Sequence, residues 1–354
     1  MAVAETPIPG GGGTPLLAVD GLTVTFKTRG GAFNAVDGVS FQLSAGEVLG
    51  LVGESGCGKS MTSLALMGLV PFPGKISAGS IRFRGRELTQ LSSRAWRRLR
   101  GREMGMIFQE PMTSLNPVHT IGDQIVEVLC LHGAFKPVAA KAQAVALLQQ
   151  VGIPSPERRV DDYPHQLSGG QRQRVMIAMA LACDPMLLIA DEPTTALDVT
   201  IQAQILELLR TCQAERHSAI ILITHDLGVV AEVAHTVGVM YAGKIVELAP
   251  VAALYRDPQH PYTLGLLASV LTMEDGPGSA PKRLATIDGT VPNPQRLPAG
   301  CRFHPRCPFA VDRCRHEVPP LTTLAPGHQV ACWRAPLPLD ETALASRAAA
   351  EVAP

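Results

Sequence analysis

The stretch that decides the fold of this 354-residue chain is Leu167-Ser168-Gly169-Gly170-Gln171-Arg172-Gln173-Arg174, the signature stretch. Its serine and paired glycines stand at the predicted start of a helix, where backbone N–H groups and a hydroxyl can bind an anion. A second anion-binding stretch, the phosphate loop Gly53-Glu54-Ser55-Gly56-Cys57-Gly58-Lys59-Ser60, lies upstream. Two phosphate-binding segments in one chain suggest that each serves a different nucleotide.

The phosphate loop has the two fixed glycines, the lysine and the serine of a nucleotide-binding pattern. Its glycines let the backbone fold tightly around phosphates, with N–H groups pointing inward. Lys59 is predicted to reach the β- and γ-phosphates, and the Ser60 hydroxyl to ligate Mg²⁺. The predicted nucleotide ligands here are Gly53, Glu54, Ser55, Gly56, Cys57, Gly58, Lys59, Ser60 and Met61.

Two acidic residues follow an apolar strand predicted over Met186–Ala190. The strand delivers Asp191 to the Mg²⁺ shell beside Ser60. Glu192 lies one residue further on, where it can polarise an attacking water as general base. An acidic pair after a strand is common by itself, and its separation from the phosphate loop is what gives it this interpretation.

The order of predicted elements indicates an α/β protein with a parallel sheet. Two antiparallel strands are expected at the start, buried strands at 48–52, 104–108, 186–190 and 219–224, and helices between them. Residues 121–151 are expected to be mostly helical, as an insert in the α/β core. Gly and Pro residues become frequent after about residue 273, which places a boundary near 270.

Composition excludes several classes of protein. There are 31 basic and 31 acidic residues, so no overall field favours nucleic acid, and the basic run Arg94–Arg102 is expected to be a solvated helix face. Apolar runs are far shorter than the roughly 18 residues of a membrane-spanning helix. Residues 1–15 lack the pattern of a signal peptide and are expected to be a disordered leader. The chain is therefore expected in the cytoplasm, where thiols stay reduced.

All these motifs, each present once and in the same order, resemble those of ATP-binding-cassette (ABC) ATPases over residues 17–270. The resemblance implies a P-loop ATPase with a RecA-like parallel sheet core, an antiparallel β subdomain, a helical subdomain at about 110–182 and a small Cys-rich C-terminal extension. The nucleotide-binding domain would span 16–270, the extension 271–338, and a mobile tail 339–354. In this family two cassettes sandwich ATP, so the signature stretch would bind the ATP held by a partner, through Ser168, Gly169, Gly170 and Gln171.

The resemblance assigns roles to four further segments. His225 would be the switch histidine that contacts the γ-phosphate, and Gln109 would sense Mg²⁺ and the attacking water. Ala196-Leu197-Asp198 would join the two sites across the dimer, and Asp198 is also a good helix N-cap. Phe26 is the candidate for adenine stacking, with Phe33 as the alternative. Catalysis would thus rest on Glu192, His225 and Gln109, and Mg²⁺ binding on Ser60, Gln109 and Asp191.

Three Pro-containing segments resemble the dipeptide and oligopeptide importer branch: Glu110–Pro117, Tyr163–Gln166 and Pro258–Thr263. The branch implies the ATPase subunit of an importer, peripheral on the cytoplasmic face of the inner membrane. Its partners would be a homologous second ATPase, two permease subunits and an extracytoplasmic peptide-binding protein. The alternatives are an importer for nickel or glutathione, a soluble cassette ATPase in translation or DNA repair, and a small-molecule kinase, which leaves the signature stretch unexplained.

Four cysteines cluster near the C-terminus: Cys301, Cys307, Cys314 and Cys332. No C-x-x-C pair is present, so the spacing is not that of a usual zinc ribbon. Clustered thiolates in a reducing compartment favour a metal centre, either zinc or an iron–sulfur cluster. The resemblance to peptide-importer ATPases implies a [4Fe–4S] cluster, with structural zinc or unligated thiols as alternatives. The histidines among them, including His328, are expected to be solvated loop residues.

Overall fold

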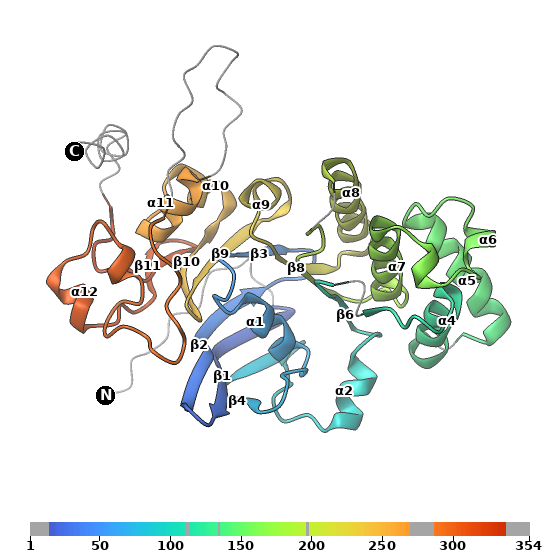
Figure 1. Cartoon of the computed structure of the whole chain (residues 1–354), viewed down its shortest axis with the longest axis horizontal. Coiled ribbons are helices and arrows are strands. Elements are labelled where there is room, and N and C mark those ends of the chain that lie inside the picture. Colours follow the sequence, from blue (N-terminus) through green and yellow to red (C-terminus); the bar gives the residue numbers. More distant parts are fainter. Residues whose placement is uncertain (1–13, 111–113, 134, 196–197, 270–286, 338–354) are drawn as a thin grey trace, which may run out of the picture.

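The computed structural model describes residues 14–110, 114–133, 135–195, 198–269 and 287–337. An eight-stranded sheet runs through the middle of the molecule in the strand order β11-β12-β10-β9-β3-β8-β7-β6 (Figure 1). Helices α8 to α11 lie on one side of it, and a second, four-stranded sheet lies on the other, below it in the view. The core is therefore an α/β arrangement, as the sequence predicts.

The parallel part of the large sheet holds the strands that carry the nucleotide motifs. It consists of β3 (Val48–Val52), β6 (Met104–Ile107), β7 (Leu187–Asp191), β8 (Ala219–Ile223) and β9 (Thr236–Tyr241). Successive residues face opposite cores: Leu49 and Leu51 pack toward the four-stranded sheet, whereas Val48 and Val52 pack toward the helices. Burial on both faces explains why these strands read as continuous apolar runs.

Helices connect these strands. They are α1 (Lys59–Leu66), α2 (Ser93–Leu99), α7 (Gly169–Leu181), α8 (Val199–Arg216), α9 (Leu227–Val233), α10 (Val251–Arg256) and α11 (Pro261–Ala268). Helices α1 and α2 pack into the core shared with the four-stranded sheet, and the others cover the opposite face. Helix α8 begins at the Asp198 N-cap, whose Oδ1 accepts from the Ile201 N–H at 2.9 Å. The predicted capping role of Asp198 is confirmed; Ala196 and Leu197 lie outside the described residues.

The four-stranded sheet is antiparallel and has the order β2-β1-β4-β5. Its strands are β1 (Leu17–Thr28), β2 (Gly31–Leu43), β4 (Gly74–Phe83) and β5 (Arg86–Glu87). Pairing of Leu17 with Leu43 and of Thr28 with Gly31 defines a long hairpin. The two antiparallel strands predicted at the start of the chain are confirmed.

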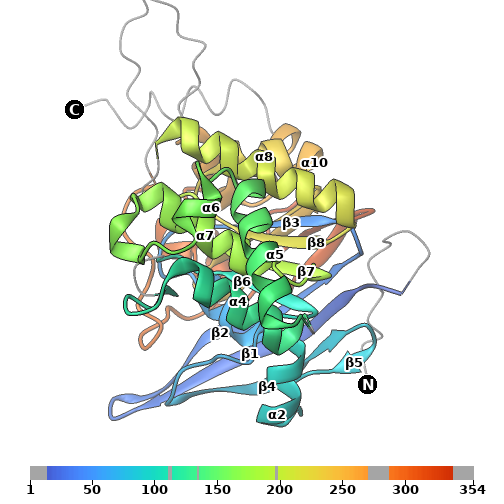
Figure 2. The same cartoon turned by 90° about the vertical axis from the view of Figure 1, so that its right-hand side faces the viewer.

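A helical unit projects from the β6 and β7 edge of the large sheet. It contains α4 (Ile121–His132), α5 (Pro137–Gln150), α6 (Pro156–Arg159), the short helix η1 (Pro164–Gln166) and α7. Figure 2 shows α4, α5 and α7 grouped in front of that edge. The predicted helical insert is thus present. Pro111, Met112 and Thr113, in the segment Glu110–Pro117 that resembles the importer branch, lie outside the described residues.

The chain after residue 287 is built onto the core rather than standing apart from it. Strand β12 (His328–Val330) pairs with β10 (Lys244–Pro250), and β11 (Thr322–Ala325) pairs with β12. The helices here are η2 (His304–Arg306) and α12 (Asp312–His316). The predicted boundary near 270 and the tail after 338 fall outside the described residues.

His328 corrects one expectation. Its side chain is buried, and its Nε2 lies 2.8 Å from Oε1 of the fully buried Glu247, so it is not a solvated loop residue. The same carboxylate accepts from the backbone N–H groups of Gln259, at 2.7 Å, and His260, at 2.9 Å. One buried acid therefore fastens β10, the segment before α11 and β12 together.

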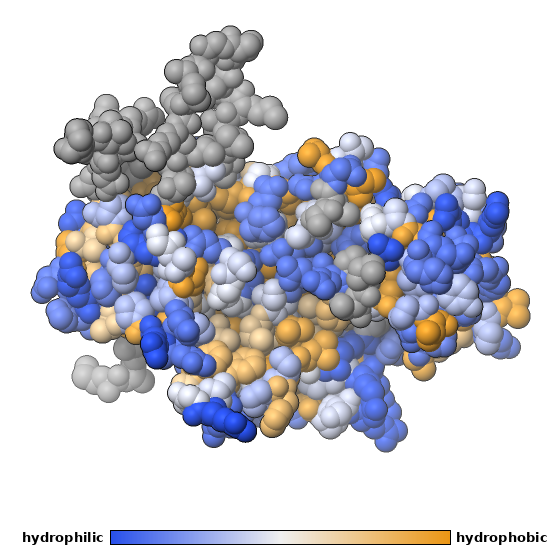
Figure 3. Space-filling model, in the orientation of Figure 1, coloured by the Kyte–Doolittle hydropathy of each residue, from blue (hydrophilic) through white to orange (hydrophobic). Residues whose placement is uncertain are grey.

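The surface in Figure 3 is mostly hydrophilic over the helical unit, and its hydrophobic residues gather in the lower centre, over the region of β1, β2 and α1. Within the described ranges, no helix combines the length and the apolar character needed to cross a membrane.

Candidate functional site

The phosphate loop leaves β3 and enters α1 with a backbone that only glycine tolerates at key positions. Gly53 has a φ of 148°, and a Cβ there would lie 2.2 Å from the Met240 carbonyl oxygen. A Cβ on Gly58, which has a φ of 110°, would lie 2.7 Å from the Ala35 carbonyl oxygen. The glycines are thus required by close backbone approach, and they leave an open cradle on the other side.

Lys59 is buried, and its Nζ donates to the carbonyl oxygens of Gly53, at 2.7 Å, and Glu54, at 3.2 Å. The ammonium group is therefore held over the loop by the loop's own backbone. An ammonium in this position supplies the positive charge that a polyphosphate needs.

Ser60 and Asp191 meet at the end of β7, as the sequence predicts. The Ser60 hydroxyl donates to Asp191 Oδ1 at 3.1 Å, and Ser63 donates to the other oxygen at 3.1 Å. Burial raises the pKa of Asp191, although both serine hydroxyls oppose this shift. Two hard oxygen ligands in a buried place suit Mg²⁺, which also neutralises the carboxylate. Ser63 is a partner that the sequence prediction did not include.

Glu192, Gln109 and His225 converge beside this pair. Glu192 Oε2 accepts from Gln109 Nε2 at 3.2 Å and lies 3.6 Å from His225 Nδ1. The Thr195 hydroxyl also donates to it, at 2.7 Å. The backbone φ of Glu192 is 49°, in the left-handed region, which costs a non-glycine residue about 1–2 kcal/mol. Strain of this kind is retained where a side chain must be aimed, here toward the cradle.

Ser60, Gln109 and Glu192 line one cavity of about 230 Å³, whereas Asp191 and His225 lie outside its lining. Many of the nucleotide ligands predicted from the sequence line this cavity. Pro292 and Pro294 of the C-terminal extension also line it, and the sequence did not suggest them. Phe26 is elsewhere: its ring stacks on Phe33 with centroids 5.6 Å apart, and neither ring lines the cavity. Their assignment to adenine stays a prediction. The lining residues predicted from the sequence are Ser55, Gly56, Gly58, Lys59, Ser60, Met61, Gln109 and Glu192.

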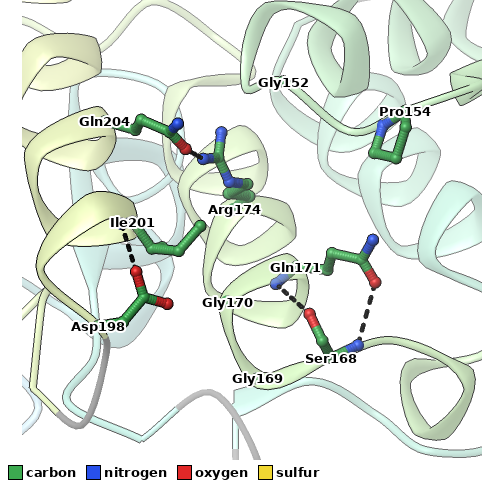
Figure 4. A pocket seen from close by; sticks show the side chains of 10 residues that line it. All are labelled: Gly152, Pro154, Ser168, Gly169, Gly170, Gln171, Arg174, Asp198, Ile201 and Gln204. Carbon is green, nitrogen blue, oxygen red and sulfur yellow. Dashed lines mark hydrogen bonds between the residues drawn. The ribbon is translucent and has the colours of Figure 1, made fainter.

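The signature stretch lines a different cavity, of about 540 Å³. Ser168 is the N-cap of α7, and it exchanges two hydrogen bonds with Gln171: the Gln171 N–H donates to the hydroxyl, and Oε1 accepts from the Ser168 N–H (Figure 4). Gly169, Gly170 and Asp198 line the same cavity. It shares no lining residue with the phosphate-loop cavity, so one chain presents two separate cavities.

The four C-terminal cysteines line one small cavity together with His260 and Phe303. All four are free thiols. Burial raises the pKa values of Cys301 and Cys332, and it raises the pKa of Cys307 to about 12. Among the described residues, no three His, Cys, Asp or Glu side chains have the arrangement of a formed metal site. The donor set therefore suits a soft metal, but its sulfur atoms are not already arranged around one.

Comparison with known proteins agrees with this fold and site. A family model described as "ABC transporter" matches residues 36–195, and one described as "Oligopeptide/dipeptide transporter, C-terminal region" matches residues 246–314. A solved structure of the ATP-binding cassette MJ0796, dimeric and bound to ADP and Pi, has a TM-score of 0.61 at 26% identity, covering 66% of this chain and 98% of that one.

Curated relatives extend the match to nearly the whole chain. The dipeptide transport ATP-binding protein DppD of Escherichia coli K12 is 51% identical over 92% of this chain and 98% of its own length. The oligopeptide transport ATP-binding protein OppD of Bacillus subtilis is 53% identical over 90% and 89%. The chain belongs to the ABC transporter ATP-binding proteins, in the dipeptide and oligopeptide transport branch.

Proposed function

We propose that this chain is the ATP-hydrolysing subunit of an importer for dipeptides or short oligopeptides. The observation that carries the proposal is the meeting of Gln109, Glu192 and His225 beside Ser60 and Asp191, at the rim of a glycine cradle. The names of the relatives, which match over nine-tenths of the chain, supply the transport function and its substrate class.

The chemistry of hydrolysis follows from the placement of these side chains. ATP would lie against the phosphate loop, with Lys59 supplying positive charge. Mg²⁺, held by Ser60, Asp191 and Gln109, would neutralise phosphate charge. Glu192 would take a proton from the attacking water, and Gln109 and His225 would hold that water and the γ-phosphate. Phe26 is proposed to stack on adenine.

Each site would be completed by a second, homologous ATPase subunit. Support comes from the separation of the two cavities within one chain. Ser168, Gly169, Gly170 and Gln171 would then bind the γ-phosphate of the partner's ATP at the N-terminus of α7, where the helix dipole is positive. The isolated chain is expected to turn over slowly, and full-rate hydrolysis by a proven monomer would contradict this.

Contact with two permease subunits would run through the segment around Met112–Pro117. In its described part, Gln124 of α4 holds Asn116 on both sides: Oε1 accepts from the Asn116 N–H at 2.8 Å, and Nε2 donates to the Asn116 carbonyl at 3.1 Å. Asn116 is thus fixed to the helical unit, whose movement it would share. The chain would be peripheral on the cytoplasmic face of the inner membrane, and a separate extracytoplasmic protein would bind the peptide.

The four-cysteine cavity is proposed to hold a [4Fe–4S] cluster, with zinc as the alternative. The support is the gathering of four free thiols around one cavity. Anaerobic purification followed by iron, acid-labile sulfide and zinc analysis separates the possibilities. A colourless, iron-free protein with full activity would reject the cluster.

Uptake measurements test the transport proposal. Cells lacking the gene would receive either the wild-type chain or Glu192→Gln, and uptake of a labelled dipeptide, a pentapeptide and nickel would be followed. Restoration of one peptide class by the wild type alone is the expected result. Restoration of nickel uptake only would move the substrate to the alternative, and failure to restore any uptake would reject the importer function.

A further inference from the structure

An arginine of the C-terminal extension reaches into the phosphate loop. Arg306 Nη1 donates to Glu54 Oε2 at 2.7 Å, and Nη2 donates to Oε1 at 2.9 Å. The two parallel bonds form a bidentate pair, the geometry in which a guanidinium binds a carboxylate most strongly. The Arg306 side chain is 6% exposed and that of Glu54 28%, so this is a partly buried contact across 252 positions of sequence.

Arg306 is itself fixed on every side. Its Nε donates to the Asp288 carbonyl at 2.7 Å, and its Nη2 also donates to the Ile287 carbonyl at 3.1 Å. The guanidinium carbon lies 5.8 Å from the centre of the Tyr241 ring. The hydrogen bonds to Glu54 are the main reason why the pKa of Arg306 is raised. A side chain held in this way is a rigid support rather than a surface ion-pair partner.

The same loop residue has a second anchor. The Glu54 N–H donates to the Tyr262 hydroxyl at 2.8 Å, and Tyr262 is fully buried in α11. Its ring packs edge-on against Tyr241, with centroids 4.7 Å apart. Backbone and side chain of Glu54 are therefore both held by residues that lie outside the ATPase motifs.

The charge of Glu54 explains why such a support is needed. A carboxylate within the phosphate loop repels a polyphosphate, and the repulsion is strong where water is partly excluded. Arg306 neutralises that carboxylate. In addition, Pro292 and Pro294 of the same extension line the phosphate-loop cavity. The extension thus contributes both a wall and a compensating charge to one site.

We propose that residues 287–306 are a built-in part of the nucleotide site of their own chain, with Arg306 as the positioning residue that neutralises Glu54 so that the phosphate loop accepts a nucleoside triphosphate. The inference rests on the proposed ATP-binding function and deepens it. Because repulsion grows with the number of phosphate charges, loss of Arg306 weakens ATP binding more than ADP binding.

Calorimetric titration of the full chain with MgATP and with MgADP tests the proposal. Arg306→Met is expected to weaken ATP binding about tenfold, one step of 1.4 kcal/mol, and ADP binding less. Glu54→Gln combined with Arg306→Met removes the unpaired carboxylate and is expected to restore ATP affinity to within about threefold. Arg313→Met is the matched control, since that arginine is 54% exposed in the same extension and pairs with Glu317.

Comparison with the wild type and with Lys59→Ala separates a failure of the proposed ATP-binding function from a failure of the proposed role of Arg306. If the wild type binds no ATP, or binds as weakly as Lys59→Ala, the proposed function fails. If the wild type binds but Arg306→Met binds equally well, or the double variant stays weak, Arg306 has no electrostatic role at the loop. If Arg306→Met does not fold, Glu54→Gln alone decides: ATP binding at least as tight as wild type supports the proposal, and weaker binding overturns it.

Discussion

Replacement of Glu247 by Gln tests whether one buried carboxylate fastens the C-terminal extension to the core. Glu247 is fully buried, and its two oxygens receive three hydrogen bonds, from the Gln259 N–H, the His260 N–H and His328 Nε2. Glutamine has nearly the same shape, so packing is preserved. Its NH₂ group, however, cannot accept, and it must face at least one of these donors.

The magnitude follows from counting these bonds. With the NH₂ group at the Oε2 position, the His260 N–H is left without an acceptor, at a cost of about 1–3 kcal/mol. The other two bonds change from charge-assisted to neutral, which weakens each by about 1 kcal/mol. The sum is about 3–5 kcal/mol, or at least about two decades in the equilibrium between docked and locally open states.

Hydrogen exchange followed by mass spectrometry measures that equilibrium directly. Peptides that cover 257–264 and 322–331 should exchange at least about a hundredfold faster in Glu247→Gln, while β7 and β8 keep their protection. Glu317→Gln serves as control, because that carboxylate is 54% exposed and paired with Arg313 on the surface. Unchanged exchange in both peptides would refute the view that Glu247 holds the extension.

Of three further predictions, two concern the nucleotide site and one concerns the cysteine cavity. Glu192→Gln should lower the ATPase rate about 10²- to 10⁴-fold in a steady-state assay while ATP still binds; an unchanged rate would exclude Glu192 as the base. Gly53→Ala should abolish ATP binding in a titration, because its Cβ would lie 2.2 Å from the Met240 oxygen, whereas Gly56→Ala, which meets nothing within 4 Å, should only weaken it. Burial raises the pKa of the Cys307 thiol from its ordinary 9.0 to about 12, so its contribution to the stability of the metal-free chain is intact below pH 9 and lost as pH rises toward 12. Cys307→Ala should flatten that fall in melting temperature, and a parallel fall would contradict it.

The nucleotide motifs could be predicted because their signals are local. The phosphate loop, the acidic pair after β7 and the N-cap at Ser168 each depend on neighbours within about ten residues, and their strands are continuous apolar runs. The same holds for the hairpin of β1 and β2. The resemblance supplied the role of Gln109, and the strand order of the structure then brings the ends of β3, β7 and β6 to one edge of the sheet.

The contacts of the extension could not be predicted because they are made by partners far apart in sequence. Strand β12 has three residues and β11 is exposed throughout, so neither gives a periodic signal. His328 reads as a loop histidine until Glu247, 81 positions away, is seen beside it. Arg306 reads as one of several basic residues among cysteines, and only the fold shows that it points at Glu54. The clustered cysteines predicted a metal centre; they line one cavity, but the described residues do not form a metal site around it, so the metal stays a prediction.

The separation of the two cavities has a consequence for genetics. In the proposed pairing, a defect at Ser168 leaves its own chain able to hold ATP and silences the site of the neighbouring subunit, whereas a defect at Lys59 silences the site that its own chain holds. If two copies of this chain pair, one copy with each defect would rebuild a single intact site from the two undamaged halves. A mutation in one subunit can then inactivate the ATP site that the other subunit holds.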